Sequence, residues 1–145
     1  MKKNSLWKSR EQIIRVLDVK NEKVFVIDCV KRSMPYWVIA DSLSGYEEYT
    51  ESKMIQETGV VISDIEKLDA ESKRFIREHF TMIAPILPFV SDMKQRIYII
   101  NQIAIEKNVS KQTIRNYLCL YLVYQNESVF CPKQKEEKEL TEDEK

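Results

Sequence analysis

One stretch of sequence decides the fold expected for the second half of the chain: Ile100-Asn-Gln-Ile-Ala-Ile-Glu-Lys-Asn-Val-Ser-Lys-Gln-Thr-Ile-Arg-Asn-Tyr-Leu118. Its pattern predicts two helices that meet at a tight turn. Ala104 is small enough to let the second helix approach closely, and Asn108 tolerates the left-handed backbone of a turn. Val109 would fill the angle between the helices. Ser110 can cap the second helix by accepting the amide hydrogen of a residue in its first turn.

These features predict a helix-turn-helix that runs from about residue 92 to residue 124. Ile103 and Ile114 would lie inward and join the helices, leaving polar side chains outward at the start of the second helix. Arginine pairs with guanine, and glutamine or asparagine with adenine, in the major groove of duplex DNA. We expect DNA contacts from Ser110, Lys111, Gln112, Thr113, Arg115 and Asn116, and from Arg96 in the preceding helix. The alternative is an ordinary helical hairpin with a polar face.

The sequence on either side of this stretch supplies a third helix. A helix capped by Asp69 should end before Pro85 and Pro88, because proline lacks the amide donor and crowds the preceding turn. Ser91 can cap the helix after it. The aromatic stripe after Ile114 favours packing against this third helix, and its members are Tyr117, Tyr121 and Tyr124. A three-helix core is therefore expected.

The first fifty residues indicate β-structure instead. Two β-branched runs, residues 12–17 and 23–30, flank a polar turn at 18–22, as in a hairpin. Residues 35–39 could add a third strand that begins at a proline. The predicted fold class is α+β, a small β-rich domain followed by a three-helix helix-turn-helix domain. The expected segments are 1–50 (β-rich domain), 51–68 (acidic connector), 69–125 (helix-turn-helix domain) and 126–145 (charged tail or linker).

Charge is distributed unevenly although the chain of 145 residues has a formal net charge of zero. Residues 1–23 hold seven basic and three acidic side chains, and residues 93–125 hold five basic and one acidic. Residues 41–79 hold ten acidic and five basic side chains. Two basic segments thus alternate with acidic ones, which supports binding to a polyanion without establishing it.

Several kinds of chemistry are disfavoured. Cys29, Cys119 and Cys131 form no closely spaced pair, and His79 is the single histidine, so no catalytic residue, metal site or cofactor is expected. Only two glycines are present, which argues against a glycine-rich phosphate loop. Asp28 follows a strand as in RNase H-like nucleases, but no later strand delivers a second aspartate for paired metal ions. Neither a membrane span nor a signal peptide is evident, and a cytoplasmic location is expected without membrane or small-molecule partners.

The order of these segments resembles a known family. The residues that carry the resemblance are Ile83-Ala-Pro-Ile-Leu87, Arg96-Ile-Tyr-Ile-Ile-Asn-Gln-Ile-Ala104 and Val109-Ser-Lys-Gln-Thr-Ile-Arg-Asn-Tyr-Leu118. They are similar to the DNA-binding region of Mu-like DDE transposases, above all the TnsB-type subunit of heteromeric transposases. Ile14-Arg-Val-Leu-Asp18 and Val26-Ile-Asp28 are similar to the β-rich leading domain of that family. The resemblance covers most of residues 10–125.

The resemblance implies a chain that grips transposon ends, with other transposase subunits as further partners. In that family the catalytic RNase H-like domain comes later, so we expect this chain to be the amino-terminal part of a longer transposase and not itself an enzyme. It also implies a second DNA contact through Lys8, Arg10 or Arg15. Two alternatives stay open from the residues alone: a stand-alone transcription regulator, and a protein-interaction module that does not bind DNA.

Overall fold

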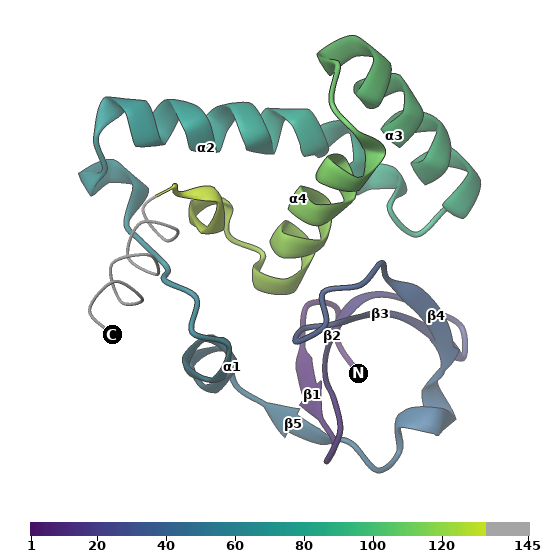
Figure 1. Cartoon of the computed structure of the whole chain (residues 1–145). Helices are drawn as coiled ribbons and strands as arrows, with labels where there is room; N and C mark the ends of the chain where they lie inside the picture. The colour runs from purple at the N-terminus through teal and green to yellow at the C-terminus, as the bar shows by residue number, and fades with distance from the viewer. Residues whose placement is uncertain (133–145) are drawn as a thin grey trace.

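The computed structural model describes residues 1–132, which form an α+β fold. Five antiparallel strands form one sheet in the order β4-β3-β2-β1-β5 (Figure 1). The strands are β1 (Leu6–Lys8), β2 (Ile13–Lys20), β3 (Lys23–Asp28), β4 (Tyr36–Ile39) and β5 (Glu47–Tyr49). The helices that follow are α1 (Glu51–Thr58), α2 (Ala70–Ile83), α3 (Met93–Lys107) and α4 (Lys111–Tyr124).

The two central strands are apolar on both faces because both faces of the sheet are covered. Ile14 and Val16 of β2 belong to a small buried cluster on one face of the sheet, together with Leu43. Ile13 and Leu17 point the other way, into the main core that the helices share. The register slips between Val16 and Asp18, where a β-bulge raises the local twist. The helices therefore pack on the face of the sheet that carries Ile13 and Leu17.

The main core runs without interruption from the sheet into the helices. It joins Phe25 and Ile27 of β3 with Ile83 of α2, Ile100 of α3 and Leu118 of α4, all buried. The aromatic stripe of α4 packs as expected, with the Phe80 and Tyr121 rings 5.2 Å apart. The sheet and the helices thus share one hydrophobic interior.

Helix ends follow the capping residues closely. Asp69 accepts a hydrogen bond from the N–H of Ser72 and starts α2, as predicted. Helix α3 is capped by Asp92, which accepts from Gln95, and not by the expected Ser91. The carbonyl of Ser91 instead accepts from Trp37. A short 3₁₀ helix over Ala84–Phe89 accommodates both prolines between α2 and α3.

Three segments differ from expectation. Strands β1 and β5 were not predicted, because each has only three residues and no visible alternation. The stretch expected as a connector contains α1, which Thr50 caps and Gly59 ends with a left-handed backbone at φ 75°. The expected tail does not begin at residue 126, since Glu127–Phe130 form a 3₁₀ helix whose Val129 and Phe130 are buried. The remainder of the expected tail, 133–145, lies outside the described residues.

Candidate nucleic-acid interface

The turn between α3 and α4 is fixed by its own hydrogen bonds. Asn108 has φ 53° and ψ 48°, the left-handed conformation expected for it. Its N–H and that of Val109 both donate to the carbonyl of Ala104. Oγ of Ser110 accepts from the N–H of Thr113 at 3.1 Å, which caps α4. The expected turn residue and cap are thus confirmed.

Helix α4 has a buried side and a polar side. Ile114 and Leu118 are fully buried and anchor the helix in the core. On its first two turns the side chains of Lys111, Gln112 and Asn116 are exposed. Thr113 and Arg115 are half-buried beside them, and Ser110 is exposed at the cap. Six of the seven residues expected at the interface therefore lie together at the amino-terminal end of α4.

Two features of this polar end determine which hydrogen-bonding groups it offers to a ligand. The side-chain amide of Gln112 donates to Oδ1 of Asn116 at 2.9 Å, which aligns the two side chains one turn apart. Within residues 1–132, Arg115 makes neither a hydrogen bond nor an ion pair, so its guanidinium has all five donors available. An aligned amide pair next to an unpartnered arginine can bind a surface rich in hydrogen-bond acceptors.

The charge around this end is positive. The cations at this end are Lys107, the last residue of α3, and Lys111 and Arg115 of α4, whereas Lys94 lies in the first turn of α3, at the far end of that helix. The only acidic residue in either helix is Glu106, next to Lys107. The amino terminus of α4 adds the positive end of its helix dipole and backbone N–H groups without intrahelical partners. This combination favours an anionic partner.

Arg96 does not belong to this cluster. Its side chain is buried, with 6% of the residue exposed, and Nη1 donates to the carbonyl of Val90 at 2.7 Å. The guanidinium lies 5.9 Å from the centre of the Phe25 ring, and burial lowers the pKa of Arg96. We therefore correct the expectation that Arg96 contacts DNA, because its donors point into the junction between α3 and the sheet.

The expected second contact is reduced to one of its three candidates. Arg15 is 1% exposed and makes hydrogen bonds inside the protein, so it cannot reach a ligand. Lys8 pairs with Glu57 at 3.5 Å and lies over the Tyr49 ring. Arg10 is exposed. Among the three, only Arg10 is therefore both exposed and without a partner in the part of the chain that the structure describes.

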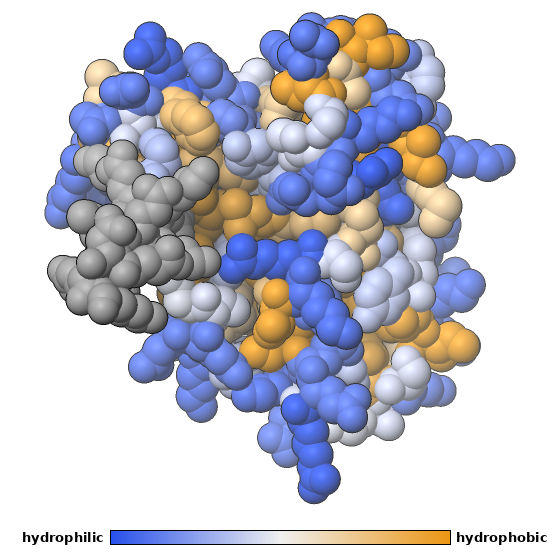
Figure 2. Space-filling model, in the orientation of Figure 1, coloured by the Kyte–Doolittle hydropathy of each residue, from blue (hydrophilic) through white to orange (hydrophobic). Residues whose placement is uncertain are grey.

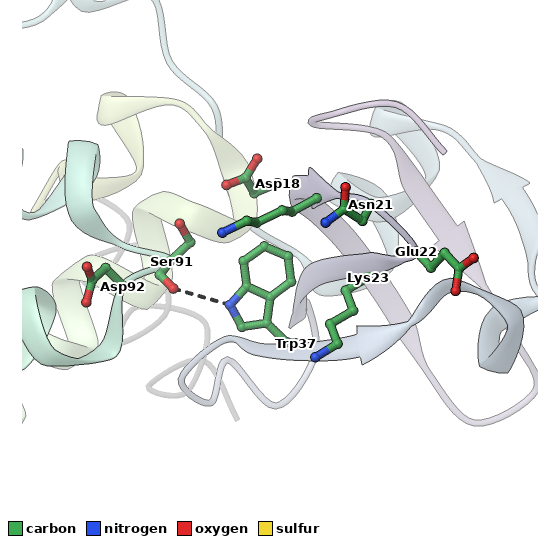
Figure 3. Close-up of a pocket in the computed structure, with 8 residues that line it drawn as sticks. Asp18, Asn21, Glu22, Lys23, Trp37, Ser91 and Asp92 are labelled. Atoms are coloured by element: carbon green, nitrogen blue, oxygen red, sulfur yellow. Dashed lines mark hydrogen bonds between the residues drawn. The ribbon is translucent and has the colours of Figure 1, made fainter.

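A groove that the sequence did not reveal lies between the β2–β3 hairpin and the start of α3 (Figure 3). Trp37 lies across it and donates to the carbonyl of Ser91 at 3.2 Å. The charged lining residues are Asp18, Lys20, Glu22, Lys23 and Asp92. Three carboxylates against two ammonium groups make this groove unsuited to a phosphate backbone, so we do not include it in the interface.

The remaining reactive side chains are engaged in structure. The Asp28 carboxylate accepts from Gln12 and from the backbone N–H groups of Val30 and Lys31, which fixes the turn after β3. Burial raises the pKa of the Cys29 thiol to about 12 and that of Cys119 to about 11. Among residues 1–132, no group of three potential metal ligands comes together, and no helix is long and apolar enough to cross a membrane.

Comparison with known proteins adds no family to this description. No family model matches the chain, and none of the curated proteins is significantly similar to it.

Proposed function

We propose that this protein binds duplex DNA with a preference for one sequence, using α3 and α4 as a helix-turn-helix. In this proposal the amino-terminal end of α4 enters the major groove. Arg115 and the Gln112–Asn116 pair contact base edges there, and Lys111 contacts a phosphate.

The observation that carries the proposal is the composition of the exposed end of α4. Polar side chains suited to base edges occupy its outer side, while Ile114 and Leu118 on the inner side are fully buried in the core. Within residues 1–132, Arg115 has no hydrogen-bond or ion-pair partner to compete with a ligand. An exposed helix without a binding role does not need an unpaired arginine on its polar side, since intrahelical ion pairs would stabilise it equally well.

The test begins with selection of bound sequences from a randomised duplex library. Fluorescence anisotropy at physiological salt then compares the selected duplex with a scrambled one. Arg115→Ala should weaken binding to the selected duplex by roughly 1–3 kcal/mol and to the scrambled one by less. Arg74→Ala, an exposed arginine of α2, is the matched control and should change neither. Failure to enrich any sequence would contradict the proposal.

A narrower form of the proposal concerns the DNA itself. The resemblance to Mu-like transposases supports transposon ends as the target, with the chain acting as the end-binding part of a transposase. Under this form the selected sequence should recur near both ends of a mobile element and should not need to be palindromic. A palindromic site with half-sites about one helical turn apart would instead favour a dimeric transcription regulator.

A second candidate function rests on a different surface. Helix α3 exposes large apolar side chains, with Met93 63%, Tyr98 61% and Ile105 75% exposed. Figure 2 shows hydrophobic patches in the upper right, where Figure 1 places α3. Exposed apolar patches of this kind often mark protein contacts. If DNA binding is absent or insensitive to salt, a protein-interaction module that uses α3 becomes the better proposal.

A further inference from the structure

The carboxyl-terminal end of α4 is fastened to the sheet by a buried arginine. Arg15, in the middle of β2, donates from Nε to the carbonyl of Val123 at 2.6 Å. Nη1 donates to the carbonyl of Asn4 at 2.7 Å, and Nη2 to Oε2 of Glu51 at 2.9 Å. The last carbonyls of a helix have no partner within it, and a cation there opposes the negative end of the dipole. Arg15 therefore satisfies the end of α4 from within the sheet.

A second arginine reinforces the same junction. Arg32, in the loop between β3 and β4, donates to the hydroxyl of Tyr124 at 2.9 Å and lies 5.4 Å from the centre of its ring. Both Arg32 and Gln125, which follows α4, have a φ of 54°. Side chains of this size rarely adopt a left-handed backbone, and they keep it where surrounding contacts hold it in place. The end of α4 is thus bonded to Arg15 of β2 and to Arg32 of the loop between β3 and β4.

The start of α3 also contacts the sheet. Trp37 of β4 donates to the carbonyl of Ser91 just before α3, and Arg96 in the first turn of α3 lies over Phe25 of β3. The start of α3 and the end of α4 are therefore bonded to the sheet, whereas no hydrogen bond among residues 1–132 joins the turn between them to it. In Figure 1, α4 descends from that turn toward the sheet. The attached ends determine where the polar end of α4 points.

We infer that Arg15 is a positioning residue for DNA binding: by holding the last turn of α4, it sets the direction of the helix that carries Arg115. This inference rests on the function proposed above. Arg15 does not touch DNA, but base contacts need placement within a fraction of an ångström and about 10–20°. A small rotation of α4 on the sheet would therefore weaken the base contacts, and with them the sequence preference, more than it weakens the phosphate contacts.

The variant Arg15→Lys tests this inference. Lysine keeps the charge, but a single ammonium cannot replace a planar guanidinium that binds Val123, Asn4 and Glu51 in three directions. Affinity for the selected and scrambled duplexes is measured at a temperature where circular dichroism shows the variant to be folded. We expect the preference for the selected duplex to fall about tenfold, the size of one lost base contact, with binding to the scrambled duplex unchanged. Lys8→Ala, which breaks an exposed ion pair with α1, is the control and should leave the preference intact.

A double-mutant cycle separates positioning from a general loss of structure. If Arg15 acts through the direction of α4, Arg115→Ala should cost much less affinity in the Arg15→Lys background than in the wild type. Equal costs in both backgrounds, or an unchanged preference in folded Arg15→Lys, would overturn the inference. If Arg15→Lys does not fold, Glu51→Gln weakens the contact that orients the Arg15 guanidinium at an exposed side chain, and the same two outcomes apply to it. A wild-type protein without sequence preference would overturn both this inference and the proposed function.

Discussion

The side chains of Gln112 and Asn116 lie one helical turn apart on α4 and are joined by a hydrogen bond of 2.9 Å from Nε2 to Oδ1. This bond uses one donor of Gln112 and leaves its carbonyl oxygen free, while both N–H groups of Asn116 remain available. An amide held in one orientation can bind the N7 acceptor and N6 donor of adenine in the major groove. Under the proposed function, this pair would therefore contact an A·T base pair.

Loss of Gln112 should relax recognition at one position of the site. We expect Gln112→Ala to weaken binding to the selected duplex by roughly 1–3 kcal/mol and to remove the penalty for changing one A·T pair. Anisotropy with a set of single-substituted duplexes measures this. The control is Gln56→Ala, an exposed glutamine of α1. A uniform loss at all positions would instead indicate that Gln112 contacts the backbone.

Lys111 should behave differently, because a phosphate contact carries no sequence information. Lys111→Ala is expected to weaken the selected and scrambled duplexes equally. The slope of log affinity against log salt should become shallower by about 1, since one fewer counterion is released. Lys53→Ala on α1 provides the comparison, and its slope should equal that of the wild type. An unchanged slope for Lys111→Ala would exclude Lys111 from the phosphate contacts.

The left-handed turn between α3 and α4 gives a prediction for stability. Asn108 has φ 53°, so Asn108→Ala should destabilise the fold by about 1–2 kcal/mol, whereas Asn108→Gly should have little effect. Asn101→Ala replaces the same residue type inside α3 and should be neutral or slightly stabilising, because alanine is the best helix former. Urea denaturation gives all three values. Equal stability of Asn108→Ala and Asn108→Gly would contradict the assigned role of the turn.

The turn and the polar end of α4 could be predicted because their determinants are local. Ala104, Asn108 and Ser110 fall within seven residues, and each acts on its immediate neighbours. The contacts that Arg15 makes could not be predicted in this way. Its partners Glu51 and Val123 are 36 and 108 residues away, and a basic side chain in a strand is normally exposed. The burial of Arg96 and the pairing of β1 with β5 depend on contacts of the same non-local kind.

The 3₁₀ helix after α4 shows that non-local contacts also determine where the folded part of the chain ends. Charged residues after position 132 made the whole segment from 126 look like a tail, but Phe130 is only 3% exposed and packs 5.5 Å from the Tyr117 ring. Phe130→Ala should therefore cost about 3–5 kcal/mol of unfolding free energy. Phe89→Ala, at a site 45% exposed, should cost far less. Similar melting temperatures for the two variants would show that residues 127–130 do not contribute to the core.

Alkaline pH should reveal the burial of Cys29, whose pKa rises from 9.0 to about 12 because the thiolate would lose its hydration in the core. Between these two values the native thiol keeps its proton while the unfolded thiol loses it, so stability falls as pH rises, by about 1.4 kcal/mol per unit for one group. Cys29→Ala has no thiol at this position, so its stability lacks this dependence on pH. We expect the difference in unfolding free energy between wild type and Cys29→Ala to be constant below pH 9 and to shift against the wild type above it. Tyrosines and lysines titrate in the same range in both proteins and cancel in the difference. Curves that stay parallel up to pH 11 would mean that the Cys29 thiol ionises without leaving the native structure.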